Sequence, residues 1–163
     1  MTQTEPQPEP SPTESPLFAS DEEALAAAEE AYRAYLDVEN VIFAEGGVQP
    51  ERIEEVAVRE ALQAAREGFE SMKEKGYRAI GEAAFDSVEL QQYASSQASE
   101  QDLVFVYMCL DFTNQDVLNL ENKSVVNPDR QDRQPAEVGF DRSADGSGLI
   151  LSSRNPWTGE EVC

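Results

Sequence analysis

The run LVFVYMCLDF at residues 103–112 is the part of the chain that decides the fold. Its apolar side chains lie on both faces of an extended backbone, which is typical of a strand in the middle of a sheet that is covered on both sides. The run therefore predicts a central strand. The apolar residues Val117, Leu118 and Leu120 follow closely, and we expect the strand to continue through them with a bend.

Weaker strand patterns lie on both sides of this run. Residues 85–93 predict a half-buried strand, and residues 136–140 alternate apolar and polar side chains, as in a sheet with one face in water. The sequence Asp-Gly-Ser-Gly at 145–148 predicts a hairpin turn that leads into the apolar residues 149–151. We therefore expect a curved antiparallel sheet of about four strands.

Two amphipathic helices are predicted ahead of these strands. Ser20 and Glu23 have the spacing of a capping box, and apolar residues at intervals of three and four continue to about Phe43. A second helical pattern runs from Pro50 to Lys75, and its first residues are also compatible with a short separate turn. Helices followed by antiparallel strands predict the α+β class, as in cystatin-like or cone folds.

The first residues differ in composition from the rest of the chain. Residues 1–19 hold five of the nine prolines, together with Ser, Thr, Gln and Glu. Such a segment buries too little apolar surface to offset its chain entropy. With 163 residues, the chain has room for one domain of ordinary size. We therefore expect a disordered Pro/Glu-rich spacer at 1–19 and a single α+β domain at 20–163.

The charge balance excludes several classes of function. The chain carries 33 acidic and 12 basic residues, a net charge of −21, and no histidine. Ordinary nucleic-acid binding and anionic membrane surfaces are disfavoured because both require clustered Lys and Arg. The acidic surface is compatible with simple solubility, with attraction to a basic partner, or with mimicry of a polyanion.

Cys109 and Cys163 are the only cysteines. Without a C-x-x-C or Cys/His cluster, a structural zinc site is not expected. The residues favour a Cys109–Cys163 disulfide, which would place the protein outside the cytosol. The alternative is a buried Cys109 with an incidental free Cys163. Residues 1–16 lack the basic and apolar regions of a signal peptide, and no apolar stretch reaches the length of a membrane span.

Few motifs in the sequence indicate chemistry. The absence of histidine excludes Ser-His-Asp and Cys-His mechanisms, and the acidic runs at 127–132 and 141–145 lack EF-hand spacing. Asp86 and Asp111 interrupt apolar segments, and a carboxylate in an apolar pocket has a raised pKa and can act as a general acid or base. The favoured alternative is that each carboxylate marks where its strand leaves the core. The aromatic residues that we expect either in the core or lining a pocket are Tyr32, Tyr35, Phe85, Tyr107 and Trp157.

Three segments carry a resemblance to a known group of proteins. They are FASDEEALAAAEEAY at 18–32, VYMCLD at 106–111 and PWTGEEVC at 156–163. They resemble uncharacterised exported or lipid-anchored actinobacterial proteins with the cone fold of the nuclear transport factor two-like superfamily, which includes SnoaL-like proteins. The resemblance supports the cysteine bridge and implies a location in the cell envelope. Superfamily enzymes place Asp, Tyr or His inside the cone, and because none of their motifs matches here, no catalytic residue is assigned.

Three functions remain open. The first is a non-enzymatic, envelope-associated domain that binds a protein or a small apolar ligand. The second is a cone-fold isomerase, dehydratase or hydrolase with buried Asp and Tyr, and the third is an acidic decoy that mimics DNA. We expect no cofactor, no metal and no nucleic-acid ligand. Membrane contact would require a lipid anchor that is absent from this chain, and the protein would be a monomer or a homodimer.

Overall fold

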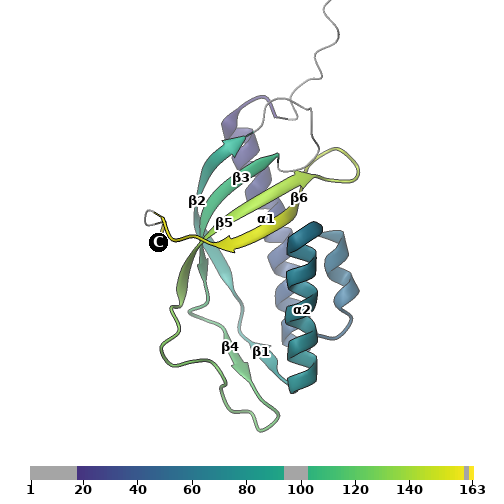
Figure 1. Ribbon diagram of the computed structural model, residues 1–163, viewed down its shortest axis with the longest axis vertical. Helices are drawn as coiled ribbons and strands as arrows, with labels where there is room; N and C mark the ends of the chain where they lie inside the picture. Colours follow the sequence, from purple (N-terminus) through teal and green to yellow (C-terminus); the bar gives the residue numbers. More distant parts are fainter. Residues whose placement is uncertain (1–17, 94–102, 160–161) are drawn as a thin grey trace, which may run out of the picture.

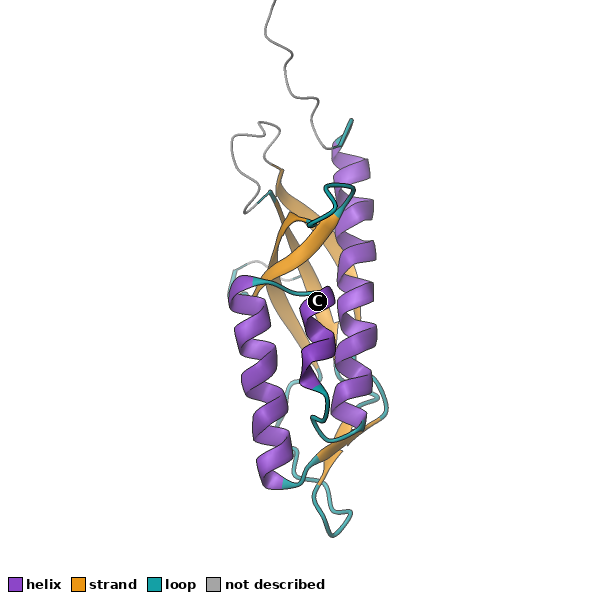
Figure 2. Ribbon diagram, turned by 90° about the vertical axis from the view of Figure 1, so that its right-hand side faces the viewer, coloured by secondary structure: helices purple, strands orange, loops and turns teal. Residues whose placement is uncertain are grey.

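The computed structural model describes residues 18–93, 103–159 and 162–163. Helices α1 (Asp21–Ala44) and α2 (Arg59–Lys75), with the 3-10 helix η1 (Pro50–Glu55), cover one face of a curved antiparallel sheet (Figures 1 and 2). The predicted α+β class is confirmed.

Four antiparallel strands form the main sheet in the order β2-β3-β5-β6. Their bounds are β2 (Ala84–Tyr93), β3 (Val104–Asp111), β5 (Arg133–Arg142) and β6 (Leu149–Pro156). A smaller sheet pairs β1 (Arg78–Ile80) with β4 (Asp116–Leu118), and Figure 1 shows it beyond one end of the main sheet. The main sheet therefore has the number of strands that the sequence predicts.

Strand β3 lies between two neighbours, as its apolar pattern predicts. Val104, Val106 and Met108 are fully buried on the side of the helices. The predicted continuation towards Leu120 is wrong, because β3 ends at Asp111 and Leu120 is 83% exposed. A carboxylate oxygen of Asp111 accepts the backbone N–H of Thr113 at 2.9 Å, and this turn ends the strand.

Helix α1 begins with the predicted N-cap. The Ser20 hydroxyl accepts the backbone N–H of Glu23 at 3.2 Å, and the Glu23 carboxylate accepts the backbone N–H of Ala19 at 2.9 Å. These bonds satisfy amide groups that a helix N-terminus otherwise leaves unpaired.

The domain begins at least two residues before the predicted boundary at residue 20. Phe18 is 9% exposed, and its ring lies 5.7 Å from the ring of Tyr93, measured between centroids. The Phe18 N–H donates to the Tyr93 hydroxyl at 3.0 Å, and that hydroxyl donates to the Phe18 carbonyl at 3.2 Å. Composition places Phe18 in the spacer because its neighbours are Pro-rich, but its side chain belongs to the core. Residues 1–17 lie outside the described part of the chain.

The second helical pattern is divided, as its first residues allowed. Ala57 forms a parallel bridge to Leu151, and the Val58 N–H donates to the Leu151 carbonyl at 2.8 Å. This contact holds the chain extended between η1 and α2, so the backbone meets the edge of β6 before the next helix starts. The η1–α2 junction is therefore held in place beside the edge strand β6 of the sheet.

The C-terminal segment covers the outer face of β3, away from the helices. Cys163 is disulfide-bonded to Cys109, with the two Cα atoms 5.3 Å apart. The Trp157 N–H donates to the Pro135 carbonyl at 2.9 Å, and the centroids of the Trp157 and Tyr107 rings are 4.5 Å apart. The sequence predicts that the central strand is covered on both faces. The helices cover one face of β3, and the C-terminal segment covers the other.

Loss of the disulfide should destabilise the domain measurably. The bond spans 54 residues, and in the chain-entropy model a loop of that length contributes about 4 kcal/mol to the free energy of unfolding. We expect Cys163→Ser to lower the free energy of unfolding in urea by about that amount, and a reductant to lower the wild-type value equally. Emission from Trp157, the only tryptophan, would report its separation from Tyr107. Equal stability of wild type and variant would contradict the predicted contribution.

Candidate functional site

The five aromatic residues proposed as a pocket lining do not share one cavity. Tyr32 and Tyr35 are buried in the core, and the half-buried Phe85 packs against them, with the Tyr32 and Phe85 ring centroids 4.9 Å apart. Tyr107 and Trp157 pair on the opposite face of the sheet. Side chains alternate along a strand, so Tyr107 points away from the face that carries Val106 and Met108.

A buried ionic cluster joins α1 to β6. The Arg154 guanidinium donates to both carboxylate oxygens of Glu39 at 3.0 and 3.1 Å, and to the Tyr32 hydroxyl at 3.1 Å. The Tyr35 hydroxyl donates to Glu39 at 3.0 Å. Sequence reasoning missed this cluster. The available signal was Glu39 itself, because it occupies a helical position four residues after Tyr35, on the apolar stripe of α1.

The charges of this cluster are mutually stabilised. Burial lowers the pKa of the Arg154 guanidinium, but the Glu39 carboxylate raises it, and the net result lies well above its ordinary value. Desolvation raises the pKa of both the Tyr32 and the Tyr35 hydroxyl. Both phenols therefore stay protonated at neutral pH, and the cluster acts as a fixed cross-link between helix and sheet.

The two candidate acid–base residues lie on the outer face of the sheet. Arg133 donates to both carboxylate oxygens of Asp86 at 2.7 and 3.0 Å, and to Asp111 at 3.0 Å. The hydrogen bonds from Arg133 lower the pKa of Asp86, and those from Thr113 lower the pKa of Asp111. A raised pKa in an apolar pocket is therefore wrong, because both carboxylates are ion-paired and reach solvent. Asp111 is the last residue of β3, as the alternative predicts.

Neighbouring side chains hold the two carboxylates of the acidic run at 141–145. Asp141 pairs with Arg59, whose Nε lies 3.1 Å from a carboxylate oxygen. Asp145 accepts the hydroxyls of Ser143 and Ser147 at 2.6 and 2.8 Å, and these bonds, the one from Ser143 first, lower the pKa of Asp145 to about 2. Among the residues with described positions, no three His, Cys, Asp or Glu side chains gather in a way that could hold a metal ion.

A groove of about 980 Å³ runs between α1, the η1–α2 junction and the β5–β6 loop. Figure 2 views the molecule from this side, with α1, η1 and α2 in front of the sheet. We call it the acidic groove. Its lining comprises Ala27, Glu30, Ala31, Ala34, Glu54, Glu55, Val56, Val58, Arg59, Asp141, Arg142, Ser143, Ala144, Asp145, Ser147, Gly148, Leu149 and Ile150.

The acidic groove combines an apolar floor with a charged rim. Ala27, Ala31 and Ala34 follow helical spacing, so three small side chains of α1 lie along it together with Leu149 and Ile150. Five acidic side chains line it against two arginines. A volume of this size is at the upper end of the range of about 300–1,000 Å³ for ligand pockets.

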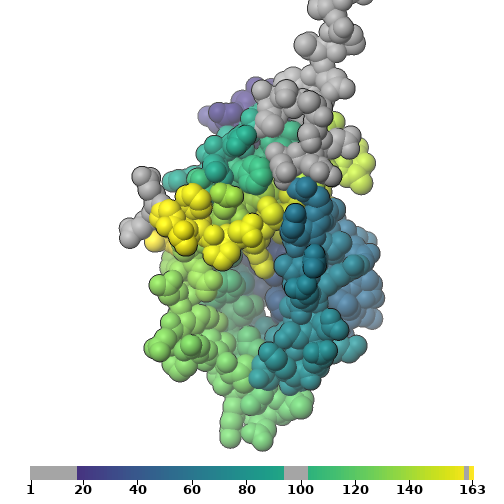
Figure 3. Space-filling view, viewed as in Figure 1, coloured from purple at the N-terminus to yellow at the C-terminus, as the bar shows by residue number. Residues whose placement is uncertain are grey.

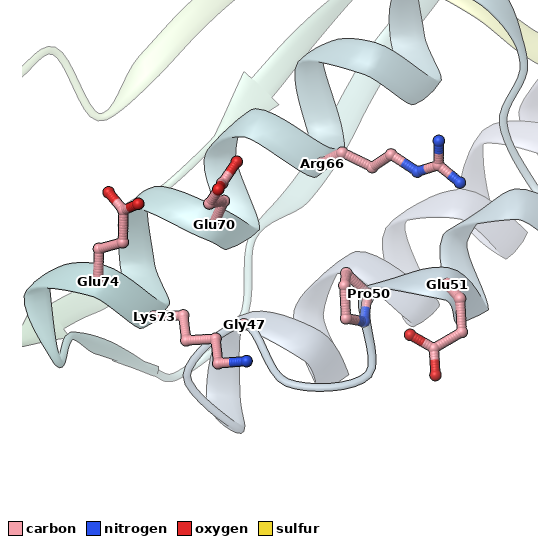
Figure 4. A pocket seen from close by; sticks show the side chains of 7 residues that line it. All are labelled: Gly47, Pro50, Glu51, Arg66, Glu70, Lys73 and Glu74. Atoms are coloured by element: carbon pink, nitrogen blue, oxygen red, sulfur yellow. The ribbon is translucent and has the colours of Figure 1, made fainter.

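A second groove, of about 640 Å³, lies between η1 and α2 and is shown in Figure 4. We call it the lower groove. It is lined by Gly47, Pro50, Glu51, Arg66, Glu70, Lys73 and Glu74. Figure 3, which faces another side, shows a further hollow between β6, α2 and the green segment that carries β4. The helix layer therefore carries a second groove that lies apart from the sheet.

Comparisons with known proteins identify a fold without a family. No protein-family model matches the sequence, and no curated protein is similar to it in sequence. The fold is similar to the crystal structure of the intermembrane space region of the chloroplast protein ARC6, with a TM-score of 0.58 and 12% identity. The match covers 83% of this chain and 97% of that chain. At this identity the similarity shows the fold alone.

The location of the protein is constrained by the disulfide. Such bonds persist in oxidising compartments, so the Cys109–Cys163 bond fits an extracytoplasmic location. None of the described helices is long and apolar enough to cross a membrane.

Removal of Arg154 should destabilise the domain strongly. The side chain of Glu39 is 6% exposed, and Arg154→Met would leave its charge buried without its ion-pair partner. Such a loss typically costs about 3–5 kcal/mol in the free energy of unfolding, measured by urea denaturation. Replacing both residues by methionine should cost less.

The matched control is Lys123→Met, which removes an ion pair whose side chains are 75% and 73% exposed. Pairs of this kind contribute less than about 1 kcal/mol. If Arg154→Met lowers the stability no more than Lys123→Met, then the buried cluster does not hold the domain together.

Acid should weaken the β5–β6 loop through Asp145. Its pKa is lowered from 3.8 to about 2, so between these values the folded protein keeps the carboxylate ionised while the unfolded chain binds a proton. Stability therefore falls as the pH is lowered from about 4 towards 2. We expect Asp145→Asn to flatten this dependence in unfolding experiments, and the exposed control Asp129→Asn to alter it less. An unchanged slope in Asp145→Asn would contradict this role.

Proposed function

We propose that this chain is a non-enzymatic, extracytoplasmic binding domain whose acidic groove receives a basic, partly apolar segment of another protein. The observation that carries the proposal is the combination of an alanine floor on α1 with five acidic side chains around it. Apolar side chains of the segment would pack on Ala27, Ala31 and Ala34. Its arginines or lysines would meet the carboxylates of the rim.

The overall charge supports a basic partner. A net charge of −21 creates a negative potential that attracts cations and speeds their association. Glu30 and Glu55 are exposed and line the groove, so they can meet a cation without a buried carboxylate having to lose its partner. The groove therefore adds a shaped apolar contact to a charge attraction that acts over the whole surface.

The cell envelope is the proposed location. The disulfide favours an oxidising compartment, and the sequence resembles exported or lipid-anchored actinobacterial proteins with a cone fold. The proposed domain would then act on a partner outside the cytosol. A SnoaL-like enzyme is the less favoured alternative, since Asp86 and Asp111 are both bound by Arg133.

Binding of a defined peptide tests the proposal. The probe is a short fluorescent peptide of alternating arginine and leucine, measured by anisotropy against the full chain. We expect saturable binding that weakens as salt is raised. Glu30→Lys combined with Glu55→Lys should weaken it by about tenfold, because two rim carboxylates are replaced by cations.

The control variant carries Asp37→Lys and Glu89→Lys, which reverse two exposed acids outside both grooves and alter the net charge equally. The control should bind the peptide more tightly than the groove variant. Equal weakening in both variants would show only general charge attraction. Equal binding of a peptide with serine for leucine, or of spermine, would also refute a role for the apolar floor.

A further inference from the structure

The two grooves share a wall. Pro50 and Glu51 of η1 line the lower groove, and Glu54 and Glu55 of the same short helix line the acidic groove. One ion pair links the linings of the two grooves: Arg66 of the lower groove binds the carboxylate of Glu54 in the acidic groove.

This ion pair lies at the surface. The side chains of Arg66 and Glu54 are 50% and 47% exposed, so water and salt reach both. Ion pairs with such exposure contribute little to stability, and one cation can replace the other at small cost. Figure 4 shows the Arg66 side chain extended from α2 across the space towards η1. Another cation can therefore replace Arg66 in the ion pair with Glu54.

We infer that the two grooves form one continuous surface for a single bound segment, and that an arginine of that segment takes the place of Arg66 on Glu54. This inference rests on the proposed function. The segment would extend from the apolar floor of the acidic groove, over Glu54, and towards Pro50 and Glu51. Arg66 acts as an internal competitor that weakens the binding of any segment without a suitable cation.

An arginine fits this position better than a lysine. The guanidinium is planar and presents several N–H donors that match a carboxylate, whereas an ammonium group is a compact, strongly hydrated charge. The residue to be displaced is itself an arginine, so its substitute must offer a comparable set of donors. The preferred partner segment therefore carries an arginine at the point where it crosses η1.

The test removes the side chain of Arg66 and measures whether the peptide then binds more tightly. Arg66→Ala should tighten binding of the arginine–leucine peptide about two- to fivefold, the range expected for one exposed ion pair. Alanine favours helix at this exposed position, so α2 should be retained, as circular dichroism can check. The gain should disappear when Glu54→Gln is added. It should also be smaller for the corresponding lysine–leucine peptide.

The matched control is Arg78→Ala, which removes one exposed arginine of β1 that lines neither groove. An equal gain in this control would overturn the inference, as would a gain that persists with Glu54→Gln. An equal gain for the lysine peptide would overturn the preference for arginine. If the wild type binds the peptide but Arg66→Ala does not tighten it, this inference alone fails, whereas absence of wild-type binding refutes the proposed function as well.

Discussion

The bidentate ion pair between Glu39 and Arg154 fixes α1 against β6, and the rest of the functional surface depends on that placement. The acidic groove is built from both elements, with Ala27, Ala31 and Ala34 on one side and the first residues of β6 on the other. A buried charge is tolerated only when its partner and hydrogen bonds are in place. The placement of α1 against β6, which line the acidic groove, is therefore held by a largely buried ion pair.

The C-terminal segment covers part of the second face of the sheet, over β3, through covalent and aromatic contacts. Cys163 is bonded to the central strand and Trp157 packs on Tyr107, so the end of the chain does what a further helix layer does in other folds. On the same face, Arg133 binds the two carboxylates that interrupt apolar strands. Asp86 and Asp111 therefore form ion pairs that join neighbouring strands. Paired carboxylates with lowered pKa values are poor general acids at neutral pH.

The folded structure places five of the acidic side chains around one groove. A charge of −21 by itself predicts solubility and attraction to cations, without a contact surface. The folded chain adds a groove in which small side chains leave room between two helices and a preorganised loop. Asp145 holds the β5–β6 loop through hydrogen bonds from Ser143 and Ser147. This carboxylate therefore stabilises one side of the groove and is not assigned to ligand binding. Shape and charge together define the proposed class of partner.

Local patterns in the sequence determined the two helical regions and the main-sheet strands of this protein, but not the small sheet of β1 and β4. The capping box at Ser20 and the apolar run at 103–112 act over a few residues, so α1 and β3 were predictable. Tertiary structure alone decided the groove and the ionic cluster. Glu39 and Arg154 are 115 positions apart, and only the packing of α1 across the sheet brings them together. Side chains alternate along β3, so Tyr107 lies on the face of the sheet away from Tyr32 of α1. Which face of a strand is turned to the core is set by its neighbours in space and not by its neighbours in the chain.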